Sequence, residues 1–201
     1  MGEDKQVEVV IVDVDPLMLR TLDIEGLLCF RCHLLEDPRV EDRSQLTREC
    51  PARGKDLEPV VTGPRSGIKA ALAEGRIIGY AIFGPPALFP NLARYEFEPD
   101  EEALFLAALY AEPEAREQNL DVDLLVAVMD FAREYGFEKV QAACRDDAAD
   151  EPEARNEVLA AAGFGVSEPV ENLCFAEISL ADWDAPDTAS EAENPTGGVG
   201  V

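Results

Sequence analysis

The chain has 201 residues, 47% of them hydrophobic, and a formal net charge of −25 at pH 7 from 42 acidic and 17 basic residues. This size suits one globular domain with its own core, and the negative field disfavours nucleic acid and anionic membranes, which bind through basic side chains. No apolar run reaches the ~20 residues of a membrane-spanning helix, and the start MGEDKQ lacks a signal-peptide layout. We therefore expect a cytoplasmic protein whose five cysteines are thiols or metal ligands rather than disulfides.

The first third of the chain predicts a strand, a helix and an irregular region. Residues 7–15 alternate and are rich in valine, which predicts a strand. Pro16 suits the first turn of the helix that should follow. Residues 29–66 show weak periodicity, so we expect short helices and loops there.

The middle of the chain predicts a hairpin, a long loop and a buried strand. Residues 67–73 and 76–83 are two strand patterns separated by a two-residue turn. The proline-rich segment 85–101 is long enough for a loop with a functional or lid role. Residues 102–110 are apolar at nearly every position, which predicts a strand buried on both faces of a mixed or parallel sheet.

The last third predicts helices alternating with strands. We expect helices over about 119–135 and 151–165, and strands over 137–144 and 173–180. Because a helix joins the strand 102–110 to the strand 137–144, these two strands should be parallel. We therefore expect one domain over residues 1–181.

The segment 182–201 changes composition and is acidic, rich in proline and glycine, and poor in apolar residues. It cannot bury enough surface to offset its ordering entropy, so we expect a disordered tail. Trp183 is the one residue of this segment that has a reason to pack back on the core.

Cysteine and histidine gather between residues 29 and 50 as Cys29, Cys32, His33 and, further along, Cys50. These are zinc-ligand types, and zinc requires four ligands in tetrahedral geometry. The spacing is incomplete as a zinc motif. The alternative is a pair of reduced thiols, partly buried near the end of the first helix.

The segment VVIVDVDPLM resembles the nucleophile motif of haloacid-dehalogenase-like phosphatases. That resemblance implies that Asp13 attacks phosphate, Asp15 acts as acid and base, and Mg²⁺ binds with help from the Arg145–Asp147 segment. However, Pro16 and the residues after it depart from the Asp-x-Asp-Gly-Thr pattern. We favour the simpler interpretation that these acids end a strand beside a helix start.

Several segments, in their order and spacing, resemble the GNAT acetyltransferase superfamily over roughly residues 66–180. They are GRIIGYAIF, LFLAALYAEPEAR with the helix after it, EYGFEKVQAAC and LAAAGF. YAIFGPPALFP, EALFLAALYAEPE and CFRCHLLEDP are similar to one bacterial branch that carries a YAPP–FP loop and a short Cys-x-x-Cys segment. The resemblance implies a GNAT-like α/β acyltransferase fold with a mixed sheet.

In GNAT enzymes the strand that matches 104–110 splays from its neighbour and holds the pantetheine arm of acetyl-CoA. The loop after it, typically Arg/Gln-x-x-Gly-x-Gly/Ala, cradles the pyrophosphate with N–H groups. Here the usual glycine positions are Glu117, Asn119 and Asp121. The resemblance implies cofactor contacts at Leu106, Leu109, Tyr110, Ala111, Arg116, Gln118 and Asn119.

The replaced glycines bring carboxylates to the place of an anion. Two like charges 4 Å apart repel by ~1 kcal/mol in bulk water and by about 4 kcal/mol at an effective dielectric of 20. In contrast, Asp121 and Asp123 would stabilise the first turn of a helix by ~0.3–1 kcal/mol each, and Asn119 can cap it. We interpret the segment as a phosphate loop by ancestry whose residues now cap a helix.

The catalytic groups of the family are poorly represented. The tyrosine that often protonates the departing CoA thiolate lies four residues before a Gly-Phe pair, and that position is Leu159 here. The candidates for a general base are Glu102 and Glu112, at the two ends of the buried strand.

Two functions follow from this pattern. The favoured one is a degenerate GNAT-fold protein that binds a protein partner or a ligand other than CoA, with a homodimer as a further option. It predicts that side chains fill the cleft under residues 85–98, or that the splay between 102–110 and 137–144 is closed. The alternative is an active acetyl-CoA-dependent N-acetyltransferase that acts on an unknown amine.

Overall fold

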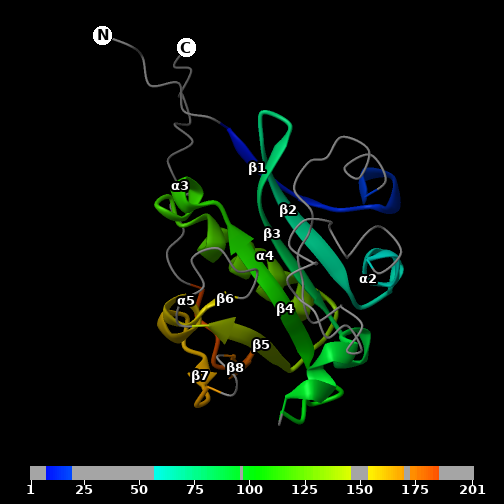
Figure 1. Ribbon diagram of the computed structural model, residues 1–201, viewed down its shortest axis with the longest axis vertical. Coiled ribbons are helices and arrows are strands. Elements are labelled where there is room, and N and C mark those ends of the chain that lie inside the picture. Colours follow the sequence, from blue (N-terminus) through cyan, green and yellow to red (C-terminus); the bar gives the residue numbers. More distant parts are fainter. Residues whose placement is uncertain (1–7, 20–56, 96, 146–153, 170–172, 186–201) are drawn as a thin grey trace, which may run out of the picture.

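The computed structural model describes residues 8–19, 57–95, 97–145, 154–169 and 173–185 (Figure 1). These residues form one mixed sheet of eight strands with helices on both faces, which confirms the α/β class. The strand order is β1-β2-β3-β4-β5-β8-β7, and β6 pairs with β5 beside this path. The strands are β1 (Val9–Asp13), β2 (Gly67–Ala73), β3 (Arg76–Gly84), β4 (Leu104–Ala111), β5 (Lys139–Arg145), β6 (Ala154–Arg155), β7 (Gly165–Val166) and β8 (Cys174–Ser179).

The strands β1 to β4 form an antiparallel meander, and β5 runs parallel to β4. The hairpin of β2 and β3 turns at Glu74 and Gly75, as predicted, and both residues have a positive φ. Gly75 adopts that conformation without strain because it has no Cβ atom. The predicted parallel pairing across the helix is also confirmed, since Leu104 pairs with Val140 in the same direction.

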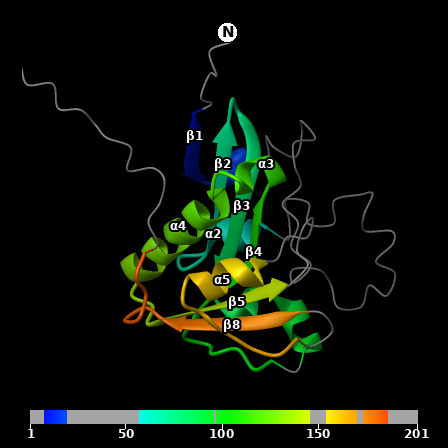
Figure 2. The same ribbon diagram turned by 90° about the vertical axis from the view of Figure 1, so that its left-hand side faces the viewer.

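Helices cover the two faces of this sheet. The main helix, α4 (Leu120–Glu134), packs across β2, β3 and β4 and is seen beside them in Figure 2. The opposite face is covered by residues 16–19, which are helical, and by α2 (Glu58–Thr62). The other helical segments are η3 (Pro86–Leu88), η4 (Pro90–Arg94), α3 (Pro113–Arg116) and α5 (Asn156–Ala161).

The strand β4 is buried on both faces, as its continuous apolar run predicted. Leu104, Leu106 and Leu109 belong to the core under α4, whereas Phe105 and Ala107 belong to the core on the other face. A strand sandwiched in this way contributes apolar burial from every side chain, at ~25 cal/mol per Å². Packing on both faces therefore holds the backbone of β4 in place.

The segment 85–98 is not an open lid. It forms the two 3-10 helices η3 and η4, which the sequence had not predicted, and its aromatic and aliphatic side chains turn inward. Phe89, Leu92 and Tyr95 are buried. Phe97 stacks on Phe175 of β8 with ring centroids 3.9 Å apart. Several side chains of this segment thus pack against the sheet beneath it.

The region before β8 differs from its prediction. We expected one helix over 151–165, but α5 spans only Asn156–Ala161, and the two-residue strands β6 and β7 flank it. Strands this short carry no periodicity that a sequence pattern can detect. Beyond Ala142, β4 no longer pairs with the edge of β5, so this edge is available to β6.

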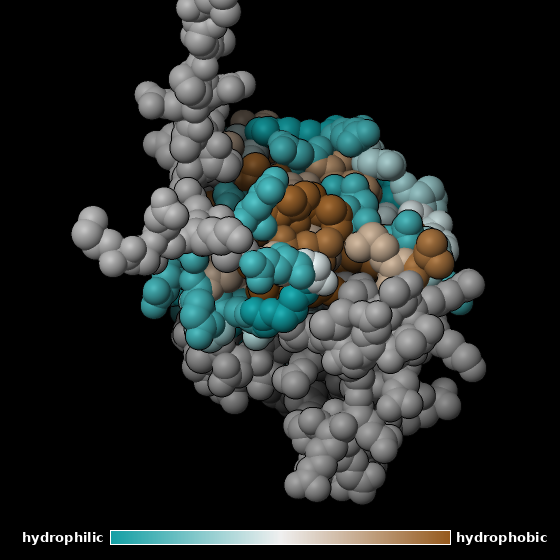
Figure 3. Space-filling view, turned by 90° about the horizontal axis from the view of Figure 1, so that it is seen from above, coloured by the Kyte–Doolittle hydropathy of each residue, from teal (hydrophilic) through white to brown (hydrophobic). Residues whose placement is uncertain are grey.

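A groove opens at the end of the molecule that carries β1 and α3. Its volume is about 940 Å³, and it lies between β1, the hairpin of β2 and β3, the loop after α3, and α4. Viewed from this end, the surface shows a hydrophobic patch framed by hydrophilic residues (Figure 3). The groove is therefore an amphipathic surface at the edge of the sheet.

The predicted metal residues Cys29, Cys32, His33 and Cys50 lie outside the described residues. In the part of the chain that is described, no group of three or more His, Cys, Asp and Glu side chains is placed to hold a metal ion. Cys144 and Cys174 are buried, and neither forms a disulfide among the described residues. The same described residues include no helix that is both long and apolar enough to span a membrane.

The predicted tail lies mostly outside the described residues, which end at Ala185. Trp183 is 3% exposed and packs on the core under α4, as its apolar character suggested. Its backbone oxygen also accepts a hydrogen bond of 3.0 Å from Nη2 of Arg133. The ordered fold therefore extends at least to this tryptophan.

Candidate functional site: the splay between β4 and β5

The strands β4 and β5 diverge after three residue pairs. Their parallel pairing joins Leu104 to Val140, Phe105 to Gln141, and Leu106 to Ala142. The candidate contact Leu106 is therefore bonded into the sheet, while Leu109, Tyr110 and Ala111 lie beyond the pairing. A splay at this place is the feature that the resemblance implied for a pantetheine arm.

A short strand occupies this splay. One edge of β5 pairs with β8 along its length, up to Cys144 with Cys174. The pairing of Cys144 with Ala154 and of Arg145 with Arg155 must therefore use the opposite edge, which β5 shares with β4. The strand β6 also packs against β4. Backbone from the chain itself thus lies where the two strands separate.

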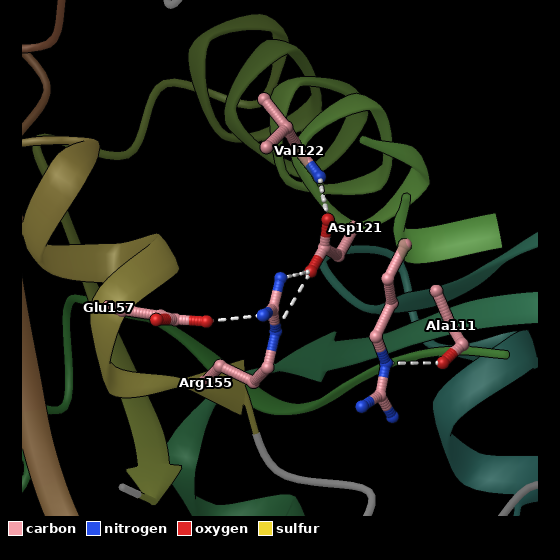
Figure 4. A network of polar contacts seen from close by, with 6 residues as sticks. Ala111, Asp121, Val122, Arg155 and Glu157 are labelled. Carbon is pink, nitrogen blue, oxygen red and sulfur yellow. Dashed lines mark hydrogen bonds and ion pairs between the residues drawn. The ribbon is translucent and has the colours of Figure 1, made fainter. Parts of the chain in front are cut away.

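An ion pair spans from this strand to the first turn of α4 (Figure 4). Arg155 of β6 donates from Nε and Nη2 to Oδ2 of Asp121, at 3.2 and 2.6 Å. Arg155 also donates from Nη1 to Glu157. The side chain of Asp121 is 6% exposed and that of Arg155 is 30% exposed, so the pair is largely removed from water. It holds the start of α4 against β6.

The carboxylate of Asp121 also serves its own helix. Its Oδ1 accepts a hydrogen bond of 3.1 Å from the backbone N–H of Val122. An anion at this position interacts favourably with the positive end of the helix dipole. Asp121 therefore provides, from inside the protein, the negative charge that a bound phosphate would bring.

The loop amides that would cradle a pyrophosphate are mostly used within the loop. The N–H groups of Glu117, Gln118 and Asn119 donate to the carbonyl oxygens of Pro113, Ala115 and Arg116, at 3.4, 3.1 and 2.9 Å. These bonds continue the single turn of α3 into α4. An amide that donates within its own turn does not also point at an external anion.

Arg116 is turned toward the strand rather than toward the loop. Its Nε donates to the carbonyl oxygen of Ala111 at 2.6 Å, and its guanidinium carbon lies 5.5 Å from the centroid of the Tyr110 ring. The carbonyl at the end of β4 is thereby engaged by a side chain. Gln118 is exposed and lines the groove beside β1, not the splay.

Asn119 does not cap α4 with its side chain, contrary to our expectation. It has a φ of 61°, in the left-handed region, and makes no side-chain capping bond. Instead, its backbone oxygen accepts the N–H groups of Val122 and Asp123 at 3.0 and 3.1 Å. The conformation is one that glycine adopts readily, so the backbone keeps the shape of a glycine position.

This conformation yields a first prediction. We expect Asn119→Gly to be neutral or to stabilise the protein by up to ~0.5 kcal/mol, whereas Asn119→Ala should destabilise it by about 1 kcal/mol, because alanine is strained at positive φ. Urea unfolding of the two variants measures the difference. Equal stability of the two variants would show that the loop relaxes out of this conformation.

The candidate bases lie far apart and in different surroundings. Glu102 is exposed before β4, and its N–H donates to Oδ1 of Asp100 at 3.0 Å. Glu112, after β4, forms a two-bond ion pair with Arg76, whose pKa is raised first by the hydrogen bond and then by the charge of Glu112. Ten residues of extended chain separate them by about 33 Å, so they do not share one site.

The position of the family's acid is part of the core. Leu159 is fully buried in the cluster under α4 and α5. Asp123, in the first turn of α4, has its pKa raised by partial burial and secondarily by the charge of Asp121. That shift indicates a desolvated carboxylate among like charges.

Asp13 and Asp15, the two acids of the phosphatase hypothesis, each bond to a nearby residue. Asp13 ends the edge strand β1 and pairs with Lys69 at 2.6 Å. Oδ1 of Asp15 accepts the N–H of Met18 at 2.7 Å, which is the bond of a helix cap. Arg145 ends β5, and the two aspartates after it lie outside the described residues. The described residues give the phosphatase hypothesis no support.

Comparison with known proteins identifies the fold. No family model and no curated protein matches the sequence. Among solved structures, the PaiA N-acetyltransferase of Thermoplasma acidophilum, in complex with coenzyme A, is 13% identical, with 86% of this chain and 99% of that chain covered and a TM-score of 0.57. YhbS of Escherichia coli, a GNAT family N-acetyltransferase in complex with CoA, is 19% identical, covers 90% and 87%, and has a TM-score of 0.53. The polyamine N-acetyltransferase of Drosophila melanogaster is 16% identical, covers 86% and 100%, and has a TM-score of 0.57. At these identities the likeness shows the GNAT fold, which confirms the fold that the sequence predicted.

The residues around the splay do not fit the pyrophosphate of CoA as they are arranged. A carboxylate already occupies the first turn of α4, and Arg155 neutralises it from β6. The amides of Glu117, Gln118 and Asn119 are bonded to carbonyl oxygens of the same segment. The arrangement forms a closed internal network in place of an open anion site.

Proposed function

We propose that this protein is a GNAT-fold binding protein whose acetyl-CoA site is closed by its own side chains. The observation that carries this proposal is the ion pair between Arg155 and Asp121, which joins β6 to α4 across the mouth of the splay. In this proposal the fold is kept as a scaffold, and the protein acts through a partner or a ligand other than CoA.

The electrostatic repulsion between a bound phosphate and Asp121 supports the proposal. A phosphate placed beside Asp121 meets a like charge, at a cost of about 4 kcal/mol for each pair at an effective dielectric of 20 and a separation of 4 Å. A micromolar dissociation constant corresponds to about −8 kcal/mol. One such pair would remove up to about half of that affinity, and Arg155 offsets part of the repulsion while it stays bonded to Asp121.

The surroundings of the splay support it as well. The segment 85–98 packs its side chains beneath itself, with Phe97 stacked on Phe175. Leu159 can neither donate nor accept a proton at the position of the family's acid. The packing leaves less room for a cofactor, and the leucine leaves no proton-transferring group at the position of the family's acid.

Titration of the full chain with acetyl-CoA tests the proposal. We expect no heat by isothermal titration and no rise in melting temperature at 1 mM ligand. A ligand at 100 times its dissociation constant would add about 2.7 kcal/mol of stability, which a thermal scan resolves easily. A micromolar dissociation constant would contradict the proposal.

A second candidate is an acetyl-CoA-dependent N-acetyltransferase that acts on an amine. The observation in its favour is the divergence of β4 from β5 after Leu106, together with the CoA in the complexes of PaiA and YhbS. It requires Arg155 to release Asp121 when the cofactor arrives. Micromolar binding of acetyl-CoA, followed by acetylation in a screen of amines, would favour this candidate.

A further inference from the structure

The groove between β1 and α4 lies beside the splay and shares residues 117–119 with the candidate cofactor loop. Its floor is apolar and comes from strands of the sheet, from α3 and from the outer side of α4. The floor residues are Val9, Ile11, Ala73, Ile78, Ala115, Leu120, Val126 and Ala127. Asp121, Arg155 and Arg116 do not line it. Its volume of about 940 Å³ falls in the range of ~300–1,000 Å³ that is usual for ligand sites.

The rim of the groove is acidic. It carries Glu112, Glu114, Glu117, Asp123 and Asp130. The single basic residue of the lining, Arg76, is engaged by Glu112, with Nη2 and Oε2 2.8 Å apart. Within the described part of the chain, the other four carboxylates have no ion pair. The surface therefore favours a cation.

The groove continues onto an open sheet edge. Among the described residues, β1 pairs with β2 on one side only, and no strand covers its outer edge. Val9 and Val10 are 38% and 46% exposed on this edge. An exposed apolar edge strand offers unpaired N–H and C=O groups to another extended chain.

The dimensions of the two features match. The five residues of β1 extend about 17 Å, and the part of α4 from Leu120 to Asp130 rises ~15 Å. A strand added to β1 would lie about 4.8 Å from it and would turn every second side chain toward α4. Lysine or arginine at those positions would cover the apolar floor with its methylene stem and reach the acidic rim with its charge.

We propose that β1 and this groove bind an extended segment of a partner protein, added as a strand to the edge of the sheet, with basic residues at every second position facing α4. This inference rests on the proposed binding function and identifies the surface and the chemistry of the partner. A second copy of this chain is a poor occupant, because each copy has a net charge of −25 and the same acidic rim. The terminal residues 186–201 are also unsuitable, since they include acids but no lysine or arginine.

The test uses the full chain and a ten-residue peptide of alternating lysine and valine, titrated by calorimetry at physiological salt. Two control peptides accompany it: one with glutamate in place of lysine, and one with the same sequence whose backbone nitrogens are all methylated, so that none can donate to a strand edge. We expect the lysine peptide to bind and both controls to fail. Failure of the lysine peptide at 1 mM, or equal binding of the N-methylated peptide, would overturn the inference.

Variants then test which residues form the peptide-binding site. We expect Asp123→Asn with Asp130→Asn to weaken binding by about 3- to 10-fold. The matched pair Glu134→Gln with Glu138→Gln, exposed residues outside the groove, removes the same charge and should change binding by less than about 2-fold. Val9→Lys should abolish binding, because it places a cation on the floor. Equal effects of the two charge pairs would indicate only long-range attraction and would overturn the inference.

Two further readouts separate this inference from the proposed function. Sedimentation of the chain alone should show a monomer, and an association that Val9→Lys abolishes would mean that a second copy occupies the edge. Acetyl-CoA is titrated into the same samples. Binding of acetyl-CoA with an unchanged affinity for the peptide would reject the closed cofactor site and leave the groove in place.

Discussion

Replacing Arg155 with methionine is expected to lower the free energy of unfolding by about 2–3 kcal/mol. Removing one partner of a fully buried ion pair typically costs 3–5 kcal/mol, because the other charge is left unpaired. The value here should be smaller, since the side chain of Arg155 is 30% exposed. Methionine keeps much of the length of the arginine stem, so the loss reports the charge more than the packing. Urea unfolding at pH 7 measures the change.

Arg76→Met is the matched control for this variant. Arg76 also forms an ion pair with a carboxylate, Glu112, but its side chain is 55% exposed. Exposed pairs contribute about 0–1 kcal/mol. A double-mutant cycle of Arg155→Met with Asp121→Asn should give a coupling of at least ~1 kcal/mol. If the two arginine variants lost the same stability, the pair at the splay would be an ordinary surface contact, and the closure we describe would lack an energetic basis.

Opening the site should create affinity for acetyl-CoA. The variant combines Glu117→Gly, Asn119→Gly and Asp121→Gly with Arg155→Ala. It removes both charges of the buried pair together and leaves only Glu157, which is 73% exposed, without its partner. It also frees the loop backbone to approach a phosphate. We expect the dissociation constant to fall from above 1 mM to about 10 µM, a change of two orders of magnitude or about 2.7 kcal/mol. Calorimetry measures it, with circular dichroism to show that the fold is kept.

The informative control is the variant with glycines at 117 and 119 alone. It has the flexible loop but keeps Asp121 and Arg155 joined, so we expect it to bind acetyl-CoA no better than the original chain. If this variant bound acetyl-CoA as tightly as the opened variant, the loop side chains, and not the ion pair, would be what prevents cofactor binding. A folded, opened variant without any affinity would mean that the packing under residues 85–98 closes the site independently.

Sequence patterns within single segments were sufficient to predict most of the secondary structure. The hairpin of β2 and β3, the fully apolar β4 and the amphipathic α4 were predicted because their signals lie within one continuous segment. The GNAT resemblance added their order. In contrast, β6 and β7 escaped prediction because two residues cannot display a period, and both exist only where a neighbouring strand leaves an edge uncovered.

The candidate site was predicted in part. The sequence predicted an altered phosphate loop at this position and suggested that Asp121 stabilises a helix start, which its bond to Val122 agrees with. It misplaced Asn119, whose side chain was expected to cap α4. It offered Arg116 as a cofactor contact, whereas in the structure this side chain donates to the carbonyl oxygen of Ala111. Whether these residues ever contact CoA stays a prediction.

By itself, the sequence determined the fold class, the succession of elements and the loss of glycine at the loop, because periodicity, turn chemistry and residue identity are properties of neighbours in the chain. Only the tertiary structure decided which side chain bonds to Asp121. Arg155 and Asp121 are 34 residues apart and meet because β6 fills the splay. The groove likewise exists only when β1, at one end of the chain, lies beside α4. Ion pairs and grooves depend on distance in space, which no local pattern encodes.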